Sequence, residues 1–114
     1  MKTILAATLL IIATSPLANA TQEITCGDIV FSVPAKVGDL PSMDFECPVQ
    51  VKFFSFRDRN LLLIANDEQD TSRVRVVISA QLNKTAEAYV GQIIRDEGGH
   101  ELQLTNGPVA CSVK

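Results

Sequence analysis

The chain has 114 residues, of which 46% are hydrophobic and 20% are charged, and its net charge at pH 7 is −3. This length fits a single small domain. The acidic balance argues against nucleic acid as a partner, because proteins that bind it present a basic patch, whereas it suits a basic protein partner.

The first twenty residues are typical of a secretory signal peptide. Lys2 gives one positive charge, residues 4–12 form an apolar run, and Ala-Asn-Ala at 18–20 fits the small-x-small cleavage pattern. The run is too short to span about 30 Å of hydrocarbon, so we expect no membrane anchor. Removal of the first 20 of the 114 residues leaves 94, with nine basic and 13 acidic side chains and a net charge of −4.

Three cysteines remain after this cleavage: Cys26, Cys47 and Cys111. An exported domain sits in an oxidising compartment, so the sequence predicts one disulfide and one left-over thiol, with three pairings open. The left-over thiol is either buried or links two copies into a homodimer. Three scattered cysteines and one histidine, without a C-x-x-C pattern, are too few for a metal site, and we expect no cofactor.

The first half of the mature chain reads as strands separated by turn residues. Residues 23–33 predict a strand with a bulge at Gly27, and a linker leads from there to residue 43. Apolar and polar residues alternate over 49–53, which is the pattern of a half-buried strand. The pair Phe53-Phe54 shifts this phase and indicates a second bulge or a strand that changes faces. A charged turn at residues 57–60 ends the strand.

The second half continues the pattern and contains no convincing amphipathic helix. A hairpin is predicted around Gly98-Gly99, and Asn-Gly-Pro at 106–108 predicts a turn. Six to eight short strands favour an all-β fold, either a small antiparallel barrel or a sandwich. The predicted strands cover residues 61–65, 73–82, 88–95, 100–104 and 109–113.

The sequence offers little material for catalysis. His100 is the only imidazole, and nothing beside it reads as a serine or cysteine nucleophile. The carboxylate pairs at 67–68 and 96–97 lie at predicted loop ends, where such charges are usually solvated. No phosphate-binding or dinucleotide motif is present. We therefore expect the protein not to be an enzyme.

Basic residues gather on the strongest predicted strand. Arg73 and Arg75 share one of its faces, and Lys52 and Arg95, on other predicted strands, could lie near them. Two interpretations remain open for this face: a solvated barrel surface or a patch that faces an anion.

Four short motifs resemble the periplasmic and membrane-bound inhibitors of c-type lysozyme. Phe-Glu-Cys at 45–47 is similar to the aromatic-x-Cys opening of that family, and Thr-Ala-Glu-Ala-Tyr at 85–89 to its Ser-Gly-x-x-Tyr. Residues 98–104 resemble its Lys-Gly-x-Glu-Ala-x-Leu, and Cys111 stands at the place of its terminal cysteine. The resemblance covers residues 44–114, so that 21–43 form a separate N-terminal strand and linker.

The resemblance implies a fold, a partner and a site. It implies a small antiparallel β-barrel joined by a Cys47–Cys111 disulfide, which leaves Cys26 over, and a periplasmic location. The partner would be a peptidoglycan-cleaving lysozyme, most naturally of the c type, inhibited by loops that enter its substrate cleft. The residues at the matching positions and their neighbours are Thr85, Ala86, Tyr89, Arg95, Gly98 and His100.

This sequence departs from the family at the inhibitory positions. Thr85 keeps the hydroxyl of the family's serine, but Gly98 replaces its lysine, so the cation that would meet the two carboxylates of a lysozyme is missing. Arg95 or His100 would have to supply it. The alternative function is a non-inhibitory binding or assembly module of the cell envelope on the same barrel.

Overall fold

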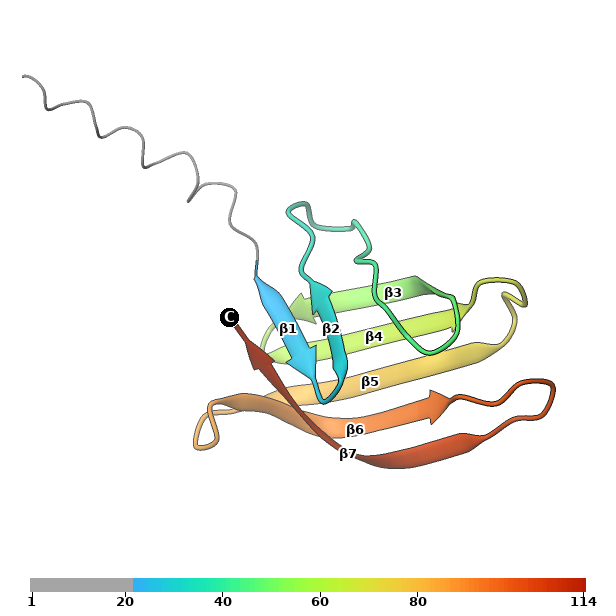
Figure 1. Cartoon of the computed structure of the whole chain (residues 1–114). Helices are drawn as coiled ribbons and strands as arrows, with labels where there is room; N and C mark the ends of the chain where they lie inside the picture. Colours follow the sequence, from blue (N-terminus) through green and yellow to red (C-terminus); the bar gives the residue numbers. More distant parts are fainter. Residues whose placement is uncertain (1–21) are drawn as a thin grey trace, which may run out of the picture.

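Seven antiparallel strands form one curled sheet in the computed structural model, which describes residues 22–114 (Figure 1). The all-β class and the strand number are confirmed, whereas the signal peptide predicted at 1–20 lies outside the described residues. Residues 22–114 include no apolar helix that could cross a membrane. The strands are β1 (Glu23–Cys26), β2 (Ile29–Ser32), β3 (Val49–Arg57), β4 (Asn60–Asp67), β5 (Val74–Asn83), β6 (Ala88–Asp96) and β7 (Leu104–Val113).

The sheet has the order β2-β1-β7-β6-β5-β4-β3 and curls into a half-barrel. In Figure 1 the β1–β2 hairpin lies across the strands of the other half of the sheet. Phe31 of the edge strand β2 meets Phe54 of the opposite edge strand β3 edge to face, with ring centroids 5.8 Å apart. Side chains rather than backbone hydrogen bonds therefore join the two edges across the core.

The core follows the period-2 alternation of the central strands. Leu61, Leu63 and Ala65 of β4 are buried, and they lie opposite the buried residues Ala80, Ile78 and Val76 of β5. Full burial of a leucine side chain such as that of Leu63 contributes about 1.5–3 kcal/mol to the stability of the fold, relative to leaving it exposed. These pairs place β4 and β5 against the core, and the loops at both rims extend from the ends of these strands.

The N-terminal strand predicted over residues 23–33 is wrong in one respect, because it is two strands. Cys26 and Ile29 pair directly, so Gly27 and Asp28 form a two-residue turn. Gly27 has a φ of 66°, which suits glycine at the first central position of such a turn. The predicted bulge is thus a hairpin turn, and β1 and β2 belong to the same sheet as residues 44–114.

The turn predicted at residues 106–108 is also wrong, because β7 runs straight through it. Pro108 lies opposite Gln92 of β6, and the stretch predicted as a strand over 100–104 is mostly loop. Strand β1 pairs only with residues 111–113 of β7, so β7 around Pro108 has β6 as its one neighbour. A strand with one open side can accommodate a proline.

The disulfide joins Cys26 to Cys111, and the implied Cys47–Cys111 pairing is wrong. Cys26 and Cys111 lie directly opposite each other on β1 and β7, with their Cα atoms 4.2 Å apart. Cys47 precedes β3, which is at the far edge of the sheet from β1 and β2. It carries a free, half-buried thiol.

The charged turn predicted at 57–60 is confirmed, and it yields a stability prediction. Asp58 and Arg59 have φ angles of 55° and 64°, a region that costs a non-glycine residue free energy. Arg59→Gly should therefore raise the free energy of unfolding by about 0.5 kcal/mol, after the entropic cost of glycine. Urea unfolding of both proteins measures this. Arg57→Gly, inside β3, should instead destabilise, and equal effects of the two substitutions would contradict the account.

Candidate functional site

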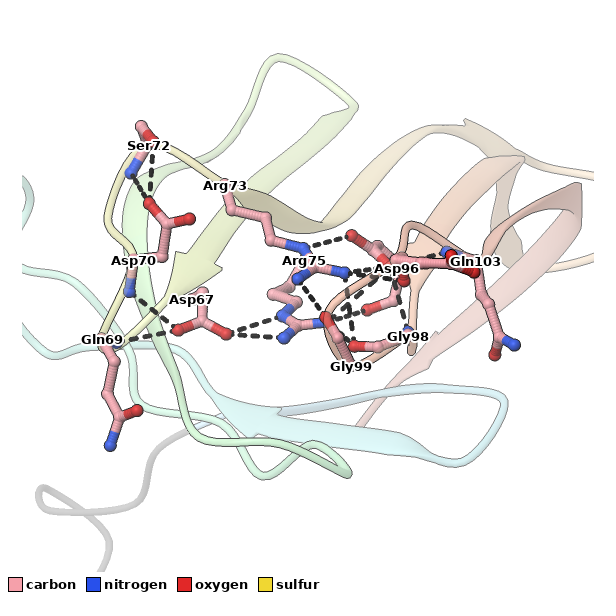
Figure 2. Close-up of polar contacts among 11 residues, drawn as sticks. Asp67, Gln69, Asp70, Ser72, Arg73, Arg75, Asp96, Gly98, Gly99 and Gln103 are labelled. Atoms are coloured by element: carbon pink, nitrogen blue, oxygen red, sulfur yellow. Dashed lines mark hydrogen bonds and ion pairs between the residues drawn. The ribbon is translucent and has the colours of Figure 1, made fainter.

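Two arginines and two aspartates meet at one rim of the half-barrel. Strand β4 ends at this rim with Asp67, and β6 ends there with Asp96. Strand β5 begins there, with Arg73 directly before its first residue and Arg75 as its second. Figure 2 shows the arginine side chains between Asp67 on one side and Asp96 with the following loop on the other. Antiparallel pairing of the three strands brings these residues together.

Asp96 is the buried anion of this network. Its side chain is completely buried, and Arg73 binds it through two parallel hydrogen bonds, Nε to Oδ2 at 2.7 Å and Nη2 to Oδ1 at 3.1 Å. Arg75 places Nη1 3.7 Å from Oδ1 of the same carboxylate. A two-point contact of this kind fixes both orientation and distance.

Arg75 is buried as well, with 5% of its surface exposed. Its Nε donates to Oδ2 of Asp67 at 2.9 Å, and its Nη2 lies 2.7 Å from the same oxygen. Its Nη1 donates to the backbone carbonyls of Asp96 at 3.0 Å and Gly98 at 2.7 Å. All three nitrogens of the guanidinium therefore have acceptors, which offsets the cost of burying the charge.

The network holds the loop of residues 97–103 from the inside. Arg73 donates to the carbonyl oxygens of Gly98, Gly99 and Glu101. The Oδ1 atom of Asp96 accepts from the backbone N–H groups of Gly98 and Gln103, each at 3.1 Å. Backbone groups near both ends of the loop and in its middle are thus fixed.

The other side of the loop faces solvent. His100, Glu101 and Leu102 are exposed, with Leu102 at 64%. Gly98 is buried, and a Cβ added there would collide with the backbone carbonyl of Glu101, whereas a Cβ at Gly99 would meet open space. The loop therefore presents an imidazole, a carboxylate and an apolar side chain on a fixed backbone.

The arginines and the loop lower the pKa of both carboxyls. The hydrogen bond from Arg73, with smaller contributions from Gln103 and Gly98, holds the pKa of Asp96 well below its usual range despite burial. The pKa of Asp67 falls to about 2, because the N–H of Asp70, the Arg75 guanidinium and the N–H of Gln69 all donate to it.

These shifts predict an acid-sensitive fold. Because the folded-state pKa of both carboxyls lies below the ordinary 3.8, the unfolded chain binds more protons between about pH 4 and 2, and stability falls as pH drops through that window. The melting temperature measured from pH 6 to pH 2 should fall steeply below pH 4. Asp67→Asn should flatten this fall, and an unchanged profile in that variant would contradict the assignment.

The structure places the predicted site residues at two different rims. Thr85 and Ala86 lie in the turn before β6, whereas Gly98 and His100 lie in the loop after it. Nine residues of strand separate these loops, which is about 30 Å at about 3.3 Å per residue. One contact surface at a loop tip therefore does not contain both groups.

Tyr89 and Arg95 have partners inside the protein. The half-buried Tyr89 ring lies 5.2 Å from that of Phe56 and packs against the core.

Arg95 binds Asp28 at 2.8 Å and Glu97 at 2.6 Å, and it lies over the ring of Phe45. The hydrogen bond that Arg95 donates to the Asp28 carboxylate contributes most to raising the pKa of Arg95. Its charge is compensated within the fold.

Neither interpretation of the basic strand is right. Arg73 and Arg75 face neither solvent nor an external anion, because Asp67 and Asp96 neutralise them. Sequence reasoning missed these two partners. A signal was present, since Asp67 and Asp96 stand just beyond the predicted strands 61–65 and 88–95, and the strand predicted over 73–82 begins with an arginine.

Within residues 22–114 no three metal-ligating side chains are grouped to hold an ion. Comparison of the chain with protein-family models, with curated proteins and with solved structures gave no significant match.

Proposed function

We propose that this protein is a non-enzymatic binding module of the cell envelope that contacts a protein partner through the loop of residues 97–103. The observation that carries the proposal is the fixation of this loop by Arg73 and Asp96 from the inside. A loop already held in one conformation loses little entropy on binding, which favours affinity. Exposed His100 and Leu102 give it a polar donor and an apolar anchor.

A second candidate function is lysozyme inhibition by the same loop. Exposed His100 at the loop tip favours it, because a ring N–H of the imidazole can donate to the paired carboxylates of a lysozyme. The distance to Thr85 and the internal pairing of Arg95 weigh against it. We therefore favour the binding module.

A turbidity assay separates the two functions. The oxidised protein, with its fold checked by circular dichroism, is titrated against c-type, g-type and i-type lysozymes on a cell-wall suspension. Near-stoichiometric inhibition of one class that His100→Ala abolishes supports the inhibitor. For the module, the double variant His100→Ala/Leu102→Ala should lose a partner captured from envelope extract, whereas Thr85→Ala should keep it. Equal capture by both variants would remove the loop from the proposal.

The two glycines of the loop give a matched pair of substitutions. Gly98→Lys should destabilise the protein by about 1–3 kcal/mol, because its Cβ would collide with the Glu101 carbonyl. Gly99→Lys should melt like the wild type, since its Cβ meets open space, and it places a cation at the loop tip. Thermal unfolding of both variants measures this. Gly99→Lys then serves in the turbidity assay to ask whether an added cation creates inhibition.

A further inference from the structure

Strand β3 forms one edge of the sheet, and a groove runs beside it. The groove has a volume of about 350 Å³ and lies between residues 53–57 of β3 and residues 33–39 of the linker that follows β2. Figure 1 shows this linker arching over the β3 side of the sheet. Within residues 22–114, β4 is the only strand paired with β3.

The register shows which backbone groups of β3 face the groove. Arg57 and Asn60 flank a two-residue turn, so they form a hydrogen-bonded pair. Alternation along an antiparallel ladder then directs the N–H and C=O groups of Ser55 and Phe53 toward β4. Those of Phe54 and Phe56 point the other way, and no backbone group within residues 22–114 bonds them. They are a free template for one more strand.

The side chains around the groove are mostly apolar, and its charged lining is two cations and one carboxylate, Asp39. Val37 is fully exposed and Phe53 is 46% exposed, and both line the groove. Lys36 and Arg57 line it as well. Residues 33–39 and 52–59 together carry four cations and two carboxylates, in an otherwise acidic protein. The cations are Lys36, Lys52, Arg57 and Arg59, and the carboxylates are Asp39 and Asp58.

We propose that this groove binds an extended acidic segment of a partner protein as an eighth strand beside β3. Its backbone would bond Phe54 and Phe56, its carboxylates would meet Lys36 and Arg57, and its apolar side chains would cover Phe53. The inference goes beyond the proposed function, because the loop of residues 97–103 is a different surface.

Charge favours an acidic partner over a second copy of this chain. Two β3 strands paired edge to edge would bring Lys52 and Arg57 of both copies into one interface. Lysine and arginine on an edge strand oppose such self-pairing, and they attract a segment of opposite charge.

Backbone amide exchange in a peptide complex tests the inference. The probe is a capped synthetic peptide of nine residues in which valine and glutamate alternate, added to the oxidised protein. Exchange at the Phe54 and Phe56 amides should slow on binding, whereas the Ser55 amide, already bonded to β4, should not change. A peptide N-methylated at the positions that face β3 should fail to bind, and one methylated at the alternate positions should bind.

Substitutions separate this groove from the loop. Lys36→Glu/Arg57→Glu should weaken peptide binding at least about tenfold, while Lys84→Glu, which does not line the groove, should change it far less. His100→Ala/Leu102→Ala should bind the peptide normally, so failure of the loop proposal leaves this one intact. Absence of binding, binding without slower exchange at both phenylalanines, or a dimer that protects these amides without peptide would overturn it.

Discussion

Asp96→Asn should lower the free energy of unfolding by about 3–5 kcal/mol, the usual cost of breaking a buried ion pair from one side. The substitution keeps the shape of the side chain but removes the charge that Arg73 binds and that lies 3.7 Å from Arg75. Arg75 keeps Asp67, whereas Arg73 loses its carboxylate partner in a site that is largely closed to water. Urea unfolding monitored by circular dichroism measures the loss.

Glu97→Gln is the matched control for this substitution. Glu97 is the next carboxylate along the chain, its side chain is 32% exposed, and its pair with Arg95 is partly solvated. Such pairs contribute at most about 1 kcal/mol, so the two variants should differ by more than about 2 kcal/mol. Amide exchange at Gln103 should also accelerate in Asp96→Asn alone. Equal stability of the two variants would mean that the network does not hold the loop.

Loss of the Cys26–Cys111 disulfide should cost about 4.5 kcal/mol in the loop-entropy account, because the bond spans 85 residues of chain. Both sulfurs lie in the core, and the bond ties β1 to β7 where only a short stretch of backbone pairing joins them. We expect Cys26→Ala/Cys111→Ala to unfold at much lower urea concentration than the oxidised wild type. Without the bond, the β1–β2 hairpin should exchange its amides first.

Cys47→Ala is the control, since Cys47 is half-buried and outside the bond. It should change stability by well under the effect of the double variant. Peptide mapping of the oxidised protein should recover Cys26 linked to Cys111 and Cys47 as a thiol. A Cys47–Cys111 peptide would restore the pairing implied by the family resemblance and contradict the register of β1 and β7.

The central strands were predictable because their local pattern and their tertiary environment agree. Alternation marked β3, its phase shift at Phe53 appears as a register change between Val51 and Phe53, and the Val- and Ile-rich run is β5. The two errors at the ends arose where context overrides local signals. A glycine such as Gly27 is equally typical of a bulge and of a two-residue turn, so its identity does not distinguish them. Pro108 is tolerated within β7 because one side of that strand is unpaired there.

The candidate site was predicted only in part. The glycine-rich loop with His100 was visible in the sequence, but the ion network under it was not, because its members lie up to 29 residues apart between Asp67 and Asp96. Pairing of charges across strands depends on register, which a single sequence does not determine. The same limit explains the wrong cysteine pair.

The bond between the first and last strands also has a consequence for biogenesis. A chain made from its N-terminus contains Cys26 and Cys47 before Cys111 is added, so in an oxidising compartment the two early thiols would meet an oxidant without the native partner. A premature Cys26–Cys47 bridge then has to be exchanged before β1 can dock on β7. Maturation of this domain in an oxidising compartment should therefore depend on a disulfide isomerase, and Cys47→Ala should relieve that dependence.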